Sequence, residues 1–239
     1  MPIRFVYFDL GNVLIHFSVH RMLCQLAELA QKSEAEIQEL LFDEQRYRGY
    51  EVGEKSTEEF LDMICQSLES TPDRDALIHA ICDIFWANDP ILSIARKLST
   101  TDFPRGILSN TNPLHWHYVE TAFPRIWGFF PNHKIASFEA RSLKPFPEIY
   151  QIAFDDAKRE IPDLQPNEVL LIDDLEANVK AAQEFGFQTI HYTEFDDFLV
   201  EYKKTGLPLP SRYVDGADQN ADQNGENGDE NGEQGAEEE

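Results

Sequence analysis

The sequence predicts an α/β protein built on a parallel β-sheet, and three observations support this prediction. Short apolar runs of strand length recur along the chain and end at polar residues. Between them lie segments with apolar residues at three- and four-residue steps, the spacing of amphipathic helices. Strands and helices that alternate in this way form a parallel, Rossmann-like sheet. A chain of 239 residues has room for one such core and a modest inserted domain.

The first predicted strand is the run IRFVYF at residues 3–8, which ends at Asp9. Further strands are expected at residues 106–108, 133–137, 169–172 and 189–192, and helices at residues 147–158 and 176–185. Ligands of open parallel sheets bind beyond the carboxyl ends of the strands. We therefore expect the polar residues that end three of these runs to lie together: Asp9, Ser109, Asp173 and Asp174.

Residues 18–88 break the alternation and predict successive helices at residues 19–31, 34–45, 57–68 and 73–85. Ser33 and Ser56 are the expected N-caps of two of these helices, each with a glutamate three residues on that completes a capping box. An all-helical block inserted after the first strand predicts a cap over the site. The predicted domains are a core of residues 1–17 and 89–206 and a helical cap of residues 18–88.

From residue 207 the composition changes to Gly, Asn, Gln and acidic residues, which predicts a disordered acidic tail over residues 207–239. Residues 215–239 contain ten acids and no base, and the rest of the chain has 34 acids against 20 bases. This negative charge argues against binding to nucleic acid or to an anionic membrane. The expected partner is a small diffusible substrate. The sequence does not determine the oligomeric state.

Cysteine usage and the absence of targeting signals indicate a cytoplasmic location. The three cysteines, Cys24, Cys65 and Cys82, are odd in number and have no zinc-finger spacing, so we expect reduced core residues. The apolar start is interrupted by Asp9 and has no signal-peptide pattern. No stretch of about 20 apolar residues occurs.

Asp9 is the most informative single residue, because an aspartate that closes a buried strand costs desolvation unless it binds a metal or has a chemical task. A simple turn-capping role is the alternative for this residue alone. Three further strings accompany it: ILSN at residues 107–110, the Lys144-Pro145 pair, and LIDD at residues 171–174, followed by Asn178. Taken together they favour the chemical role.

In order and spacing, these strings resemble the four motifs of the haloacid dehalogenase superfamily. Asp9 matches motif I, Ser109 motif II, Lys144 motif III and the pair Asp173-Asp174 motif IV, with the helical insert as the cap between motifs I and II. The chain is most similar to the bacterial α-D-glucose-1-phosphate phosphatase branch, through its FDLGNV opening, its SNT at motif II and the string EVGEKSTEEF at residues 51–60.

The resemblance implies a Mg²⁺-dependent phosphatase that hydrolyses a small phosphate monoester, such as glucose 1-phosphate, through an aspartyl-phosphate. Asp9 would be the nucleophile, and Lys144 would balance the charge of the phosphate. Magnesium prefers oxygen ligands. The implied ligands are Asp9, the backbone carbonyl of Gly11, and Asp174. Implied substrate contacts come from Ser109, Asn110 and Lys144, and the implied supporting residues are Asp173 and Asn178.

One position departs from the usual phosphatase pattern. Phosphatases of this superfamily usually carry a second aspartate two residues after the nucleophile as general acid and base, and here that residue is Gly11. The similar branch also has glycine there, which fits leaving groups that need little protonation. His16 is a candidate substitute proton donor, and a histidine without that role is the alternative.

Two other functions stay open at this point. A degenerate phosphatase fold could bind a phosphorylated ligand or a partner without turnover, and Gly11 favours this hypothesis. A haloacid dehalogenase would use the same nucleophile without a metal, and the adjacent acids at motif IV disfavour it.

Overall fold

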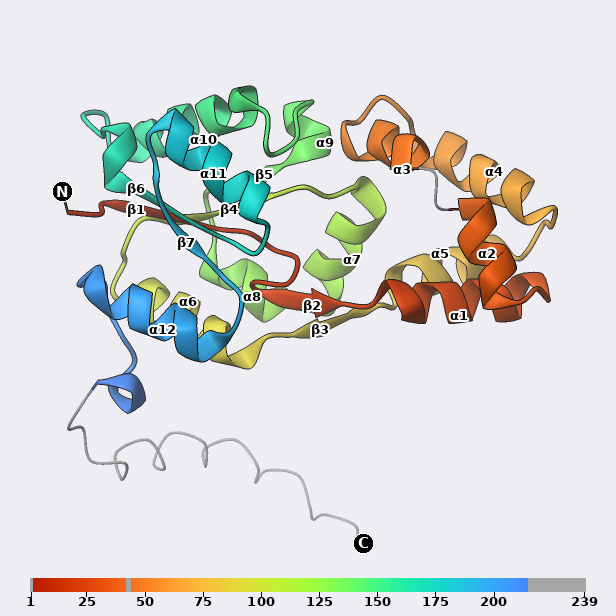
Figure 1. Ribbon diagram of the computed structural model, residues 1–239, viewed down its shortest axis with the longest axis horizontal. Helices are drawn as coiled ribbons and strands as arrows, with labels where there is room; N and C mark the ends of the chain where they lie inside the picture. The colour runs from red at the N-terminus through yellow and green to blue at the C-terminus, as the bar shows by residue number, and fades with distance from the viewer. Residues whose placement is uncertain (1, 42–43, 215–239) are drawn as a thin grey trace, which may run out of the picture.

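The computed structural model describes residues 2–41 and 44–214 (Figure 1). Within this part, five strands form a sheet in the order β5-β4-β1-β6-β7, and all neighbours pair in parallel. The predicted α/β class with a Rossmann-like parallel sheet is confirmed. The strands are β1 (Phe5–Phe8), β4 (Arg105–Ser109), β5 (Lys134–Ala136), β6 (Val169–Asp173) and β7 (Gln188–His191).

Helices cover both faces of this sheet, which explains why the strands are continuous apolar runs. Successive side chains of β1 point to opposite faces, so Phe5 and Tyr7 join one apolar cluster and Val6 and Phe8 the other. One face is covered by α10 (Pro147–Glu160) and α11 (Glu176–Phe185). The opposite face is covered by α6 (Asp89–Thr100), α8 (Pro124–Phe129) and α12 (Phe195–Lys204) (Figure 1).

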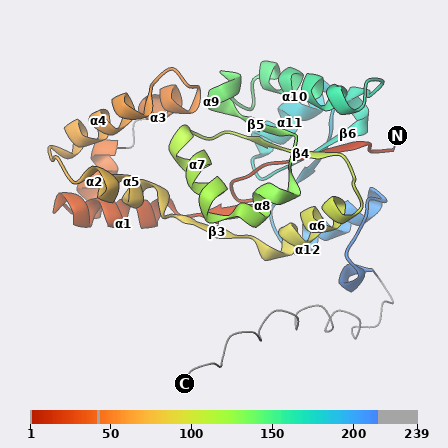
Figure 2. The same cartoon turned by 180° about the vertical axis from the view of Figure 1, so that it is seen from behind.

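Five of the helices between β1 and β4 form a separate group beside the sheet (Figure 2). They pack around an apolar cluster of their own. Leu114 and Tyr118 of α7 (Pro113–Ala122) pack against this cluster from the core side. The expected helix at residues 34–45 covers α2 and the start of α3, and residues 42–43 lie outside the described residues. The five helices are α1 (Val19–Ala30), α2 (Glu34–Leu41), α3 (Glu44–Glu51), α4 (Thr57–Leu68) and α5 (Arg74–Cys82).

A two-stranded antiparallel ribbon, which the sequence did not predict, carries the chain from the core into these helices and back. It pairs β2 (Ile15–Phe17) with β3 (Phe85–Ala87). Strands of three residues are too short to show a periodicity, and their partners are far apart in sequence. The expected helix at residues 73–85 is therefore too long: it ends at Cys82, because Phe85 pairs with Phe17.

The expected start of the acidic tail at residue 207 is also corrected. Leu207 is buried, and Leu209 and Tyr213 pack against the core, so residues 207–214 belong to the folded part. Their apolar side chains make these contacts with the core. The rest of the predicted tail, residues 215–239, lies outside the described residues.

Short elements complete the chain: α9 (Ser137–Ala140) and the 3₁₀ helices η1 (Pro166–Glu168) and η2 (Ser211–Tyr213). The three cysteines are free thiols, of which Cys82 is buried and the other two are partly buried. Within residues 2–41 and 44–214, no helix is both long and apolar enough to cross a membrane.

Candidate active site

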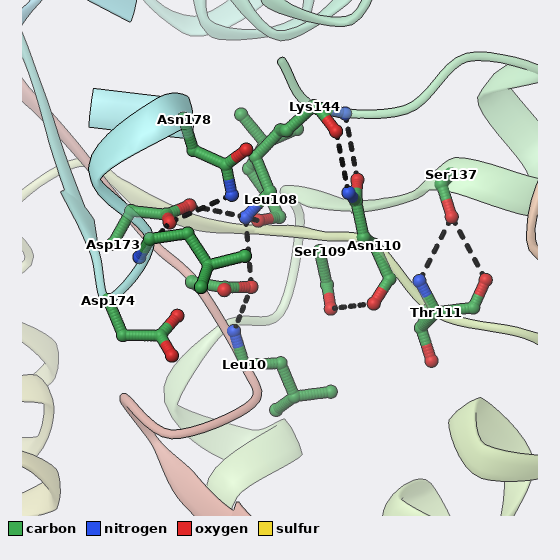
Figure 3. A network of polar contacts seen from close by, with 12 residues as sticks. Leu10, Leu108, Ser109, Asn110, Thr111, Ser137, Lys144, Asp173, Asp174 and Asn178 are labelled. Carbon is green, nitrogen blue, oxygen red and sulfur yellow. Dashed lines mark hydrogen bonds and ion pairs between the residues drawn. The ribbon is translucent and has the colours of Figure 1, made fainter. Parts of the chain in front are cut away.

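Three neighbouring strands bring the predicted site residues to one edge of the sheet. Asp9 follows β1, Ser109 ends β4 and Asp173 ends β6, and β1 lies between β4 and β6. Lys144 reaches this edge from the loop that follows α9 (Figure 3). All four side chains are buried, so the tertiary fold gathers charged groups where water has little access.

The ammonium group of Lys144 is the centre of this cluster. Its Nζ lies 3.0 Å from Oδ1 of Asp9 and 2.6 Å from Oδ2 of Asp173, and it donates to the carbonyl of Leu108 at 2.8 Å. Burial by itself would lower the pKa of Lys144, but the negative charges of Asp173 and Asp9 outweigh it and hold the pKa above its ordinary value. The lysine is therefore a fixed positive charge beside Asp9.

Asn110 holds the loop that carries Lys144. Its side-chain amide donates to the Lys144 carbonyl at 2.8 Å, and its side-chain oxygen accepts from the Lys144 N–H at 2.8 Å. This paired contact explains how a residue far along the chain is positioned against the end of β4. The predicted contact of Asn110 with a phosphoryl group stays a prediction.

Asp173 uses both of its carboxylate oxygens within the protein. Oδ2 pairs with Lys144, while Oδ1 accepts from the side-chain amide of Asn178 at 2.9 Å and from the Leu175 N–H at 3.0 Å. Because each oxygen already has a partner, Asp173 is suited to positioning Lys144 rather than to binding a ligand.

A magnesium ion fits the remaining carboxylates. Oxygen atoms of Asp9, Asp173 and Asp174 lie within 4.8 Å of one another. Since Asp173 is fully engaged, Asp9 and Asp174 are left to hold a cation, with the backbone of Gly11 in the turn directly after Asp9. Carboxylate and carbonyl oxygens are the ligands that this ion prefers. Asn12, at φ 54°, donates to Oδ2 of Asp174 at 3.1 Å and so orients it.

The electrostatics of the site also favour a bound cation. Burial raises the pKa of Asp9 to about 7, with Asp173 and Asp174 adding to the shift and Lys144 opposing it. Burial likewise raises the pKa of Asp174. Three carboxylates share one lysine, so a divalent cation would offset both the desolvation of these groups and their mutual repulsion.

The position that usually carries the second aspartate faces an aromatic ring. A Cβ added to Gly11 would lie 3.0 Å from Cε1 of Phe17, so a side chain there requires the ring to move. His16 does not take over this place. Ile15 and Phe17 line the cavity beside the site, whereas His16 between them contacts the ring of Trp86, at 5.6 Å between centroids. Neighbouring strand residues point to opposite sides, so His16 is turned away from the cavity.

This cavity, of about 230 Å³, lies between the strand ends and the group of helices α1–α5, which is called the cap from here on. It adjoins Gly11, Ser109 and Asn110 on the core side and is bounded by α1 and α3 on the cap side. Glu51, the last residue of α3, lines it as well. The site therefore offers a polar, charged region near Asp9 for one end of a substrate, and a separate space for the rest of the molecule.

Ser137 ties the cap to the core beside this cavity. Its Oγ accepts from the Thr111 N–H at 2.9 Å and lies 2.9 Å from the Thr111 carbonyl (Figure 3). It also lies 2.8 Å from the Glu51 carbonyl, and either carbonyl can accept its proton. Nearby, the backbone of Gly53 approaches so closely that a Cβ would lie 2.3 Å from the carbonyl oxygen of Phe138. The end of α3 is thereby held at the cavity.

Sequence reasoning missed four of these residues: Asn12, Phe17, Glu51 and Ser137. Asn12 and Glu51 stand in strings that carry the family resemblance, FDLGNV and EVGEKSTEEF. A polar residue of such a string was a usable signal in both cases. Phe17 and Ser137 had no local signal, because their importance comes from contacts with residues far away in the chain.

The chain is similar to a known family and to several solved structures. A family model described as haloacid dehalogenase-like hydrolase matches residues 3–186. A haloacid dehalogenase family enzyme of Bacteroides thetaiotaomicron, solved in complex with magnesium and inorganic phosphate, is 27% identical, with a TM-score of 0.70 over 80% of this chain and 95% of the other.

Two further solved structures are similar. A predicted hydrolase of this family from Porphyromonas gingivalis is 25% identical, with a TM-score of 0.71 over 87% of this chain and 100% of the other. L-2-haloacid dehalogenase from Xanthobacter autotrophicus, with chloropropionic acid covalently bound, shares the fold at 19% identity and a TM-score of 0.55, over 87% of this chain and 85% of the other. The residues matched by the family model include every predicted site residue, from Asp9 to Asn178. The chain belongs to the haloacid dehalogenase-like hydrolases.

Proposed function

We propose that this hydrolase is a magnesium-dependent phosphatase that cleaves small phosphate monoesters through an aspartyl-phosphate on Asp9. The observation that carries the proposal is the buried group at the end of β1, in which Lys144 lies 3.0 Å from the Asp9 carboxylate and a second carboxylate, Asp174, lies close by. A family member with magnesium and inorganic phosphate bound supports it.

Asp9 is suited to nucleophilic attack because one of its oxygens is held and the other is open. Oδ1 accepts from the Leu10 N–H at 2.7 Å and pairs with Lys144, and no donor among the described side chains of residues 2–40 and 47–214 reaches Oδ2. Oδ2 would attack phosphorus while the bond to the leaving oxygen breaks. Water then attacks the aspartyl-phosphate, which releases inorganic phosphate and restores Asp9.

Charge neutralisation is shared between the protein and the ion. Lys144 offers a buried positive charge, and the Ser109 hydroxyl and the Asn110 N–H are the proposed donors to phosphoryl oxygens. Magnesium, held by Asp9, the Gly11 carbonyl and Asp174, would supply further neutralisation of the phosphate dianion.

The leaving group receives no proton from position 11. Loss of a positioned acid typically costs about a hundredfold to ten-thousandfold in rate. Esters whose leaving oxygen is stable as an anion suffer least from this loss. Aryl phosphates and sugar 1-phosphates such as glucose 1-phosphate, whose anomeric oxygen is relatively acidic, are therefore the substrate classes to test first.

The decisive experiment measures phosphate release from phenyl phosphate and glucose 1-phosphate with magnesium and with EDTA. We expect magnesium-dependent turnover by the parent protein and by Asp197→Asn, an exposed control, and none by Asp9→Asn. Beryllium fluoride should form a stable adduct with the parent and not with Asp9→Asn. Equal activity of the parent and Asp9→Asn would refute the proposal.

The same assays separate the two alternatives. A phosphate-binding protein without turnover would form the beryllium fluoride adduct but release no phosphate from any ester. A dehalogenase would release chloride from 2-chloropropionate in the presence of EDTA; a relative with this activity shares the fold.

A further inference from the structure

The cavity beside Asp9 has mainly apolar walls. Leu10 and Ile15 bound it from the core and Val19 and Met22 from α1, and the aromatic rings of Phe17 and Phe85 close it at the ribbon. Apolar walls favour an apolar ligand and penalise polar groups that find no hydrogen-bond partner. The part of the substrate that enters this space is therefore expected to be largely apolar.

Two of the polar side chains in this cavity are already engaged with the protein. The Asn112 side chain accepts from the His115 N–H at 3.0 Å and lies 3.1 Å from Nδ1 of the His115 ring. The other ring nitrogen, Nε2, lies 3.2 Å from the Ile81 carbonyl. Burial lowers the pKa of His115 to about 4, so the ring is neutral. Neither side chain is free to satisfy several hydroxyl groups of a ligand.

Glu51 differs from these two side chains. Among the side chains that the structure describes, those of residues 2–40 and 47–214, no donor and no positive charge contacts its carboxyl group, and burial raises its pKa. Its backbone is held at the cavity by Ser137, at 2.8 Å from Oγ to the Glu51 carbonyl. Glu51 is partly exposed and lines a cavity with mainly apolar walls, so its carboxyl oxygens are available to accept from a donor that a ligand supplies.

The volume of the cavity limits the ligand. An apolar protein cavity of about 150 Å³ binds benzene, so about 230 Å³ accepts a ring with a small substituent. A nucleoside would extend beyond this space. A hexose is similar in size to a substituted ring, but most of its hydroxyl groups would face apolar walls.

We propose that the substrate is a phosphate monoester whose alcohol part is a compact, mainly apolar ring that carries one hydrogen-bond donor, and that Glu51 recognises this donor. The inference rests on the proposed phosphatase function and narrows its substrate class. Glu51 is the specificity residue that the cap contributes, and Asp9 acts on the phosphate at the other end of the same molecule.

The test compares phenyl phosphate with its hydroxymethyl and aminomethyl derivatives, substituted at the meta or para position, and with glucose 1-phosphate. The leaving phenols have similar acidities, so differences in kcat/KM report recognition. We expect the better donor-bearing ester to exceed phenyl phosphate in kcat/KM by about tenfold, the value of one hydrogen bond to a charged group. The two derivatives distinguish a hydroxyl from an ammonium donor.

Glu51→Leu keeps the size of the side chain and removes its acceptor oxygens. It should reduce the ratio of kcat/KM between donor-bearing ester and phenyl phosphate by about tenfold. Glu54→Leu, an exposed glutamate three residues on that does not line the cavity, should leave this ratio unchanged. A higher kcat/KM for glucose 1-phosphate than for every aryl ester would overturn the inference. So would an equal loss on all esters in Glu51→Leu, since that result indicates a role in the chemical step.

A second variant tests the size limit. Val19→Phe narrows the cavity from the side of α1. It should reduce kcat/KM for the ring-bearing esters at least about fivefold more than kcat/KM for ethyl phosphate. An equal effect on both kinds of ester would contradict the assignment of this space to the ring.

Calorimetric binding of benzylphosphonate and its hydroxymethyl and aminomethyl derivatives, with magnesium present, separates this inference from the proposed function. If no ester is hydrolysed, the phosphatase proposal fails. The recognition by Glu51 then stands if the better donor-bearing phosphonate binds about tenfold more tightly and Glu51→Leu abolishes the difference, and it falls if the difference is absent.

Discussion

The ammonium group of Lys144 lies 2.6 Å from the carboxylate of Asp173, and both side chains are fully buried. Such a pair is a poor source of net stability, because the desolvation of two charges offsets much of their attraction. Its value lies in the position that it gives to Lys144, 3.0 Å from Asp9. Removal of either partner leaves an uncompensated buried charge.

Lys144→Met should therefore lower the free energy of unfolding by about 3–5 kcal/mol and abolish the proposed phosphatase activity, because Asp9 and Asp173 would face each other without a cation. Urea unfolding of the metal-free protein measures the loss. The matched control is Lys180→Met, which removes the exposed pair with Glu176 and should leave the midpoint almost unchanged. Similar small effects of both substitutions would show that Lys144 is not held as a buried charge.

Restoring a carboxyl group at position 11 should raise the rate for esters with poor leaving groups. The ring of Phe17 stands 3.0 Å from the place of a Cβ at Gly11, so we expect the full effect in the double variant Gly11→Asp/Phe17→Ala. For ethyl phosphate, kcat should rise at least about tenfold over Phe17→Ala alone, since the new acid can protonate the alkoxide. For phenyl phosphate the gain should be smaller. No gain on ethyl phosphate would mean that proton transfer does not limit the reaction.

Substitution of Asn12 should weaken magnesium binding, although Asn12 is not one of the proposed substrate contacts. Its amide donates to Asp174 at 3.1 Å, and its positive φ is tolerated by glycine, so Asn12→Gly removes the side chain without straining the backbone. The Kd for Mg²⁺, measured by calorimetry, should rise by about tenfold, as for other partners of metal ligands. Asn132→Gly, in an exposed loop, is the control. An unchanged Kd would exclude Asp174 as a ligand that depends on Asn12.

His133, which lies outside the candidate active site, should make the free energy of unfolding depend on pH. It lies 2.7 Å from Asp156 and 2.8 Å from Glu160. The hydrogen bond to Asp156, followed by the attraction of both acids, raises the pKa of His133 although burial opposes the shift. A raised histidine pKa stabilises the folded state fully below the unfolded value of about 6.5, and this contribution is lost as the pH rises through the folded value.

The difference in unfolding free energy between the parent and His133→Gln should accordingly be largest near pH 6 and shrink towards pH 9. Urea unfolding across this range measures it, with the exposed His117→Gln as the control. A difference that stays constant over the whole range would show that the histidine is not protonated between its two acids.

Local sequence was sufficient where a structural element is stabilised by its own residues. The helix expected at residues 57–68 has these bounds in the structure, because Ser56 and Glu59 form the reciprocal capping box that their spacing predicts. The strands of the sheet were also predictable from the sequence, since a sheet covered on both faces needs uninterrupted apolar residues. The ribbon of β2 and β3 was not predictable, because its pairing joins segments that are distant in the chain.

The same division holds for the site. The sequence by itself determined which polar residues end the strands, and the carboxyl ends of parallel strands bring Asp9, Ser109 and Asp173 to one edge. It did not determine that Phe17 stands over Gly11, that His16 turns away, or that Glu51 enters the cavity. Only the tertiary structure decided these points, because each depends on how the ribbon and the cap pack against the core.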